Sequence, residues 1–280
     1  MSTGHVLILG AIAGGTIFLG LPVGRLQSLG AAARAGLSAL ATGILIFLLW
    51  DVLSGAVEPI EHGLEARHWG RFAWLAALGI AGFAAGLMAL VYYSEWMRRR
   101  SSRRATALVG PGAAAVDEFE TRGWLDSLTP GKQLALLIAV GIGVHNFGEG
   151  LAIGQAAATG AASLAVTLIV GFALHNTTEG FGICGPLTGE GTVPSWGFLG
   201  LMGLIGGGPT FLGTVLGQAW SSEALSVVFF AIAAGSILYV VQELFSVNRK
   251  YGHAVLVTWL VLVGVLLGFA TDFIVDAAGL

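Results

Sequence analysis

Residues 134–184 read LALLIAVGIGVHNFGEGLAIGQAAATGAASLAVTLIVGFALHNTTEGFGIC, two long apolar runs that are each interrupted by a short polar string. The strings are HNFGEG at 145–150 and HNTTEG at 175–180, and they begin thirty residues apart. Imidazole and carboxylate groups are costly inside a bilayer, so in such runs they mark a pathway or a site by default. The stretch therefore predicts two membrane-spanning helices that carry a polar centre.

The composition of the whole chain also indicates a membrane protein. Of its 280 residues, 55% are hydrophobic and only 10% are charged, whereas soluble domains carry about 25% charged residues. A net charge of −3 without a basic stripe excludes nucleic acid as an expected partner. The single cysteine, Cys184, excludes an intramolecular disulfide and a cysteine-rich zinc site.

The apolar runs predict an all-α integral membrane protein, with residues 1–280 forming a single domain. A membrane-spanning helix needs about 20 apolar residues, and we expect the first run to be a retained helix and not a signal peptide. The segment 98–132 contains arginines and a Gly-Pro-Gly turn signal, so it is predicted to be a flexible cytoplasmic loop. Eight transmembrane helices are predicted, at about 5–24, 33–54, 72–93, 133–157, 163–186, 196–218, 224–246 and 254–275.

The distribution of basic residues predicts the orientation in the membrane. If the N-terminus lies outside, the inner loops hold all the arginines and lysines except Arg67 and Arg71. Lysine and arginine accumulate in cytoplasmic loops. Both termini are therefore expected to be extracytoplasmic.

The two polar strings share a spacing that suits metal binding. In each string His and Glu stand at positions i and i+4, on one face of a helix, and Asn follows about 100° further round. The connection between the two helices is short, so they should be antiparallel neighbours with both strings at the same depth. Nitrogen and oxygen ligands of this kind suit a divalent transition metal such as zinc. The predicted ligands are His145, Asn146, Glu149, His175, Asn176 and Glu179.

Other interpretations of the strings remain open at this point. The polar groups could form interhelical hydrogen bonds, or the chain could be a metal sensor that binds without transport. A third alternative is an intramembrane zinc-dependent hydrolase. The usual metalloprotease string has a catalytic Glu beside its first His, and Asn146 and Asn176 occupy that position here.

Two carboxylates near the outer ends of predicted helices are candidates for an entrance. Asp51 is near the end of the second helix and Asp272 near the end of the eighth. They could attract cations to the pathway, or they could be the snorkelling ends of two helices.

The strings, their order and the eight-helix layout resemble the ZIP family of divalent metal transporters, in particular its short bacterial members. The resemblance implies transport of zinc toward the cytoplasm, with iron, manganese and cadmium as further candidates, through a metal centre between the fourth and fifth helices. The ion is then a substrate, with no resident cofactor, and the chain is not an enzyme. A 3+2+3 helix arrangement, a homodimer and a location in the cell membrane are also implied.

The resemblance extends to single residues. His145, Asn146, Glu149 and Glu179 match family ligand positions, and Asn176 matches a position where a metal-binding polar residue is usual. His175 begins the second string, although its imidazole could point away from the ion.

The resemblance also shows departures and a candidate exit. Gly148 replaces a familiar proline, so a kink would have to come from glycine. Gly208 replaces a carboxylate that helps to form a second metal position, so we expect one good site and a weak or absent second site. Gln242 and Glu243 occupy the place of a His-Glu pair, which makes them candidates for an exit path; an interfacial charge is the alternative.

Overall fold

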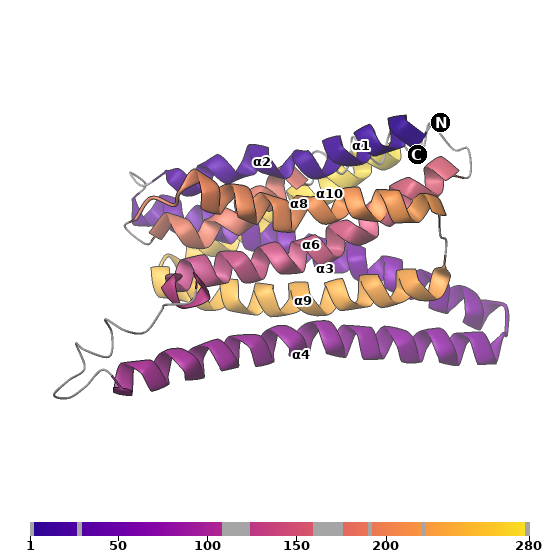
Figure 1. Cartoon of the computed structure of the whole chain (residues 1–280), viewed down its shortest axis with the longest axis horizontal. Helices are drawn as coiled ribbons and strands as arrows, with labels where there is room; N and C mark the ends of the chain where they lie inside the picture. Colours follow the sequence, from indigo (N-terminus) through magenta and orange to yellow (C-terminus); the bar gives the residue numbers. More distant parts are fainter. Residues whose placement is uncertain are drawn as a thin grey trace.

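The computed structural model describes residues 3–26, 30–107, 124–158, 176–189, 192–219 and 222–277, and all regular structure in these ranges is helical (Figure 1). The long helices are α1 (Thr3–Gly15), α3 (Ala31–Glu65), α4 (Trp69–Ala107), α6 (Pro130–Ala158), α8 (Trp196–Ala219), α9 (Glu223–Tyr251) and α10 (Ala254–Ala277). Shorter elements are α2 (Ile17–Gly20), η1 (Leu21–Arg25), η2 (Trp124–Ser127), η3 (Gly185–Gly189) and a helical segment at 176–184.

The helices confirm an all-α fold compatible with a membrane. Within the described ranges, seven helical stretches are long and apolar enough to cross a bilayer, and they match seven of the eight predicted helices. The predicted fifth helix, 163–186, lies mostly outside the described residues, and only its end at 176–184 is placed.

Helix α4 is longer than predicted and occupies part of the expected loop 98–132. With 39 residues it is roughly 58 Å long at 1.5 Å per residue, well beyond the ~30 Å of the hydrocarbon core. Its last part is rich in arginine and alanine, which favour helix, and Glu95 pairs with Arg99 one turn later at 2.7 Å. Residues 98–107 are therefore helical, and residues 108–123 lie outside the described part.

The long helices form two bundles. One bundle packs α6 and α1 against α8 and includes α2, η1, η3 and the segment 176–184; we call it the site bundle. The other packs α3 against α10 and α9, and α9 against α4; we call it the flanking bundle. Contacts of α6 with α9 and of α3 with η3 form the seam between them. The predicted 3+2+3 arrangement stays a prediction.

Glycine brings the helix backbones into direct contact inside each bundle. In the site bundle, a Cβ at Gly213 of α8 would overlap the carbonyl oxygen of Phe147 on α6. In the flanking bundle, a Cβ at Gly264 of α10 would overlap the carbonyl oxygen of Leu40 on α3. Close backbone approach of this kind is how small residues hold membrane helices together.

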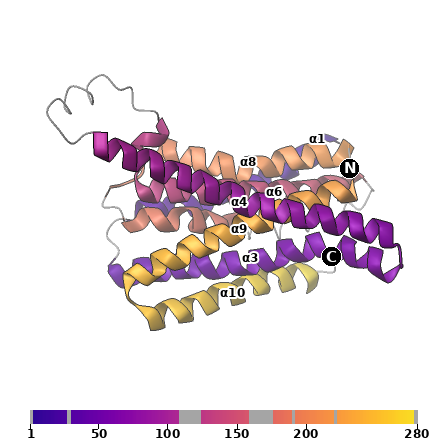
Figure 2. The same cartoon turned by 90° about the horizontal axis from the view of Figure 1, so that it is seen from below.

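The two ends of the molecule differ in charge. Both chain termini lie at one end, which we call the terminal end (Figures 1 and 2). The opposite end, the basic end, holds Arg25 at the end of η1, Lys132 at the start of α6, and Arg249 and Lys250 in the last turn of α9. This asymmetry agrees with the charge distribution from which the orientation was predicted; the orientation itself stays a prediction.

Candidate metal centre

The polar string of α6 lies buried in the middle of the site bundle. His145 and Glu149 are only 1% and 3% exposed, and His145 Nε2 lies 2.9 Å from Glu149 Oε1. The i, i+4 spacing therefore brings the two side chains together as predicted. Helix α6 is continuous through the string, and Gly148, the residue in the proline position, packs against the ring of Phe230. Its function in this structure is close packing and not a kink.

The second string meets the first through Asn146. Its amide nitrogen, Nδ2, donates a hydrogen bond to Glu179 Oε2 at 3.0 Å, and both side chains are buried. The α6 string and the 176–184 segment are therefore joined inside the protein. His175 lies outside the described residues, so its placement is not described.

Asn176 points toward α1. Its Nδ2 donates to the carbonyl oxygen of Ala13 at 2.9 Å, and the neighbouring Thr177 hydroxyl donates to the carbonyl oxygen of Thr16 at 3.3 Å. These bonds use backbone carbonyls near the break between α1 and α2, and they fix the 176–184 segment to the start of the chain.

Helix α8 supplies a backbone oxygen to the centre. Proline has no N–H, so Pro209 leaves the carbonyl of Ile205 without its usual helical partner. The next carbonyl, that of Gly206, accepts a hydrogen bond from Asn146 Nδ2 at 3.0 Å. Asn146 thus ties three segments of the site bundle together.

Gly208 does not face this centre. A Cβ at this position would meet no atom within 4 Å, and Gly208 lines a groove between α8 and α1 together with Gly14 and Phe18. The position at which the resemblance implied a lost carboxylate of a second metal site therefore points away from His145 and Glu179 in this structure.

Carboxylates approach the centre from the flanking bundle on the side of the terminal end. Asp51 of α3 is half-buried and interacts electrostatically with both His145 and Glu149. Asp272 of α10 interacts with Asp51 in turn. Asp51 therefore lies in the electrical neighbourhood of the centre, and the function of both carboxylates as an entrance stays a prediction.

A buried polar cluster on the other side of the centre escaped the sequence analysis. Asn248 Nδ2 of α9 donates to Thr42 Oγ1 of α3 at 3.0 Å, and Thr42 Oγ1 donates to the carbonyl oxygen of Ser38 at 2.8 Å. Ser38 Oγ and Asn248 Oδ1 have no hydrogen-bond partner in the described ranges. The sequence contains one sign of this buried polar cluster, which is the i, i+4 spacing of Ser38 and Thr42 in an apolar run. Of the predicted exit residues nearby, Gln242 is exposed and Glu243 is half-buried.

Apolar side chains separate this cluster from the centre. Leu45 lies one turn from Thr42 along α3, and Ile183 lies one turn from Glu179 along the 176–184 segment. Both are almost completely buried and belong to the main hydrophobic core, together with Leu187. Buried apolar side chains therefore lie next to the cluster along α3 and next to the centre along the 176–184 segment.

The donor atoms at the centre are nitrogen and oxygen. No three His, Cys, Asp or Glu side chains in the described ranges stand close enough to hold one metal ion together. Asparagine side chains are further candidate ligands in the described ranges. Oδ1 of Asn146 and Oδ1 of Asn176 are buried and accept no hydrogen bond from the part of the chain that the structure describes.

Comparison with known families decides which class of protein contains this centre. The family model of the ZIP Zinc transporter matches residues 120–276, more than half of the chain. The chain belongs to the ZIP zinc transporter family. The match includes α6, the 176–184 segment, α8 and α9, and therefore both polar strings. No match to this chain was found among curated proteins. ZIP family membership favours transport of a divalent metal across a membrane over the hydrolase alternative.

Proposed function

We propose that this ZIP family member transports zinc toward the cytoplasm through a site between α6 and the 176–184 segment, with iron, manganese and cadmium as further candidate ions. The observation that carries the proposal is the buried contact between the strings, in which Asn146 Nδ2 donates to Glu179 Oε2 beside the His145–Glu149 pair. Buried carboxylates are costly without a compensating charge, and a divalent cation supplies that charge.

The ion binds by replacing hydrogen bonds that the ligands make with one another. His145 and Glu149 turn from each other to the metal, and Glu179 adds a second carboxylate. Two carboxylates balance the charge of one divalent ion. Amide oxygens of Asn146 and Asn176 complete the shell, and His175 is a further proposed ligand. The absence of thiolate ligands suits a site that must release its ion.

The pathway runs from the terminal end, which faces outside in this proposal, to the basic end, which faces the cytoplasm. Asp272 and Asp51 attract the hydrated cation and deliver it to the centre. On release, the ion passes between α3 and α9 along the Thr42–Asn248 cluster, and Gln242 and Glu243 lie at the exit. The positive-inside rule supports this orientation of the protein because the basic residues gather at one end; the direction of transport rests on the family resemblance.

Release requires the two bundles to move against each other. The proposed ligands in the described ranges all belong to the site bundle. Leu45, by contrast, belongs to the flanking bundle and to the buried apolar core, and in this proposal it helps to close the path from the ligands to the basic end. Packed cores switch between discrete arrangements more readily than they deform. A displacement at the seam would open the path without disturbing the ligands. The family resemblance further suggests that the protein works as a homodimer in the cell membrane.

Uptake of radioactive zinc into proteoliposomes tests the proposal. We expect His145→Ala and Glu149→Ala to abolish uptake, because each removes a charged or nitrogen ligand at the centre. Glu223→Ala is the matched control, since it removes a carboxylate that forms an exposed ion pair with Arg71. The control should retain uptake.

Folding is checked by the thermal unfolding and gel-filtration profile of each purified variant. Wild-type uptake by a folded double variant, His145→Ala with Glu149→Ala, would refute the proposed site. Hydrolysis of a peptide or lipid without metal flux would refute transport itself.

A further inference from the structure

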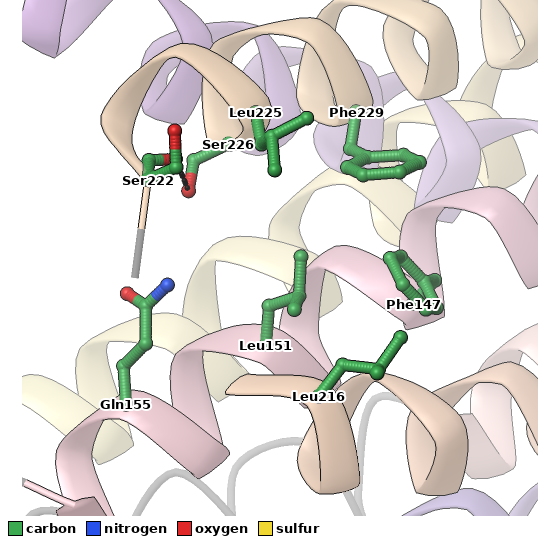
Figure 3. A pocket seen from close by; sticks show the side chains of 8 residues that line it. All are labelled: Phe147, Leu151, Gln155, Leu216, Ser222, Leu225, Ser226 and Phe229. Carbon is green, nitrogen blue, oxygen red and sulfur yellow. Dashed lines mark hydrogen bonds between the residues drawn. The ribbon is translucent and has the colours of Figure 1, made fainter. Parts of the chain in front are cut away.

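A crevice opens between the two bundles where α9 begins. It has a volume of about 180 Å³ and is walled by Phe147 and Leu151 of α6, Leu216 of α8, and Leu225 and Phe229 of α9. Figure 3 shows these side chains facing one another across the gap, with Gln155 and Ser222 at the mouth. The crevice therefore combines an apolar interior with a polar rim, and its walls come from both bundles.

The crevice continues deeper along the seam. Phe147 and Phe229 pack with their ring centroids 4.8 Å apart, and both rings also line a second cavity of about 360 Å³. The walls of that cavity are apolar and include Val144 of α6 and Leu212 of α8. Two apolar hollows that share this aromatic pair thus lie where α6 and α8 meet α9, and together we call them the cleft.

The open side of this cleft is continuous with the lipid-facing surface of the protein. Leu212 and Leu216 are 56% and 49% exposed, and they lie on a helix that is long and apolar enough to span the membrane. A purely apolar cavity does not hold water. Whatever fills the cleft from outside must therefore come from the hydrocarbon of the membrane.

The polar rim of the cleft favours a lipid, which carries polar ester groups, over a plain hydrocarbon. Gln155 presents an amide toward Ser222, which immediately precedes α9, and the Ser226 hydroxyl lies in the first turn of α9 (Figure 3). The ends of spanning helices lie at the depth of the headgroups. The Ser226 hydroxyl donates to the carbonyl oxygen of Ser222 at 3.3 Å, so the donors of the rim are the Gln155 amide and the Ser222 hydroxyl, which match the ester carbonyl oxygens of a glycerophospholipid whose chain points inward.

We infer that the cleft binds one acyl chain of a membrane glycerophospholipid, in the leaflet that surrounds the start of α9, with its ester region at Gln155 and Ser222. The chain contacts both bundles and stabilises the relative position in which the cleft is open. Because transport in the proposed function changes that position, the lipid regulates the rate of uptake; this consequence rests on the proposed function.

Photolabelling tests the site independently of transport. The full chain is reconstituted in vesicles of phosphatidylcholine that include a phosphatidylcholine with a photoreactive diazirine in one acyl chain, and labelled residues are identified by mass spectrometry. We expect labels to concentrate on Leu151, Leu225 and Phe229. Leu216→Trp fills the cleft and should lower labelling at these residues by at least about five-fold, because a filled interior has no room for a chain.

A matched variant controls for the added tryptophan. Leu266 lies on α10, is 56% exposed and lines neither of the two cavities of the cleft, so Leu266→Trp should leave cleft labelling unchanged. Labels spread evenly over the lipid-facing helices, or cleft labelling that Leu216→Trp leaves intact, would overturn the inference. Loss of cleft labelling at a high protein-to-lipid ratio would show that a second copy of the chain fills the cleft. That result would also overturn the inference.

The labelling result does not depend on the metal site. Zinc uptake that survives loss of His145 and Glu149 would refute the proposed function and leave the lipid site standing. If Leu216→Trp removes the label and also changes the rate of zinc uptake at unchanged zinc binding, the regulatory consequence is supported. An unchanged uptake rate without the label would overturn that consequence.

Discussion

Helices pack differently inside the two bundles and across the seam between them. Inside a bundle, backbone meets backbone, as where Gly213 of α8 lies against the carbonyl of Phe147. At the seam the nearest groups are farther away: a Cβ at Gly182 would lie 4.0 Å from Leu45 Cδ1, one at Gly141 would lie 3.6 Å from Val240 Cγ2, and one at Gly185 would lie 3.8 Å from Ser38 Cα. We propose that the seam is the surface at which the two bundles shift against each other.

The two bundles also contribute different chemistry. The site bundle holds the hydrogen-bonded histidine, asparagine and glutamate side chains of the centre, whereas the flanking bundle contributes Asp51 and the apolar wall around Leu45. We propose that the site bundle binds the ion and that the flanking bundle controls its access.

A disulfide across the seam should stop transport. A Cβ at Gly141 of α6 would lie 3.7 Å from Ser236 Cβ of α9, within the roughly 3.5–4.5 Å that a disulfide needs. In a Cys184→Ala background, Gly141→Cys with Ser236→Cys should lower zinc uptake at least about tenfold when oxidised, because a needed movement is blocked. A reductant should restore it.

The matched control places a disulfide inside one bundle. A Cβ at Gly63 of α3 would lie 3.6 Å from Phe72 Cβ of α4. Gly63→Cys with Phe72→Cys should leave uptake nearly unchanged on oxidation. If oxidation lowers uptake equally in the two double-cysteine variants, or if the variant with the oxidised seam disulfide retains full uptake, movement at the seam is not required for transport.

Removing the charge of Asp51 should slow capture of the ion but not its binding. Negative charge along an entrance raises the local cation concentration. Asp51→Asn should therefore raise the KM for zinc uptake by about three- to tenfold, and its zinc affinity at equilibrium in detergent should change little. A complete loss of zinc binding would instead show that Asp51 is a ligand, and it would contradict the proposal that only the site bundle binds the ion.

Glycine substitutions should affect stability differently where the glycine contacts a neighbouring backbone and where it faces open space. Gly213→Ala places a methyl group against the backbone of α6 and should lower stability by about 1–3 kcal/mol. Gly208→Ala meets no atom within 4 Å and should leave stability unchanged or raise it, because alanine is the better helix former. Thermal unfolding in detergent measures both. Equal destabilisation of the two variants would contradict the packing described above.

The ion pair of Arg71 with Glu223 should matter least. Both side chains are exposed by more than a third, and exposed pairs contribute about 0–1 kcal/mol. Arg71→Gln should shift thermal unfolding only slightly and leave zinc uptake unchanged. A large fall in uptake would mean that the contact between α4 and α9 takes part in transport.

The fold class and the contact of His145 with Glu149 could be predicted because both depend on local patterns. Apolar runs of sufficient length predict membrane helices, and an i, i+4 spacing places His145 beside Glu149 on any helix. The length of α4 could not be predicted in this way, because a charged, arginine-rich segment is compatible with either a loop or an extended helix.

The grouping of the helices could not be predicted either. It depends on which glycine faces which carbonyl, and no single segment contains that information. The orientation of Gly208 away from the centre and the contact of Asn248 with Thr42 likewise join residues that are far apart in sequence. Such contacts follow from packing. The family resemblance therefore identified Gly208 as part of a second metal position, but it did not show which way this residue faces.

The most direct test of the metal centre is anomalous X-ray diffraction from crystals of this protein soaked with zinc. We expect one strong peak between α6 and the 176–184 segment, in contact with His145, Glu149 and Glu179. A strong peak bound only to Asp51 and Asp272, with nothing beside His145, would contradict it.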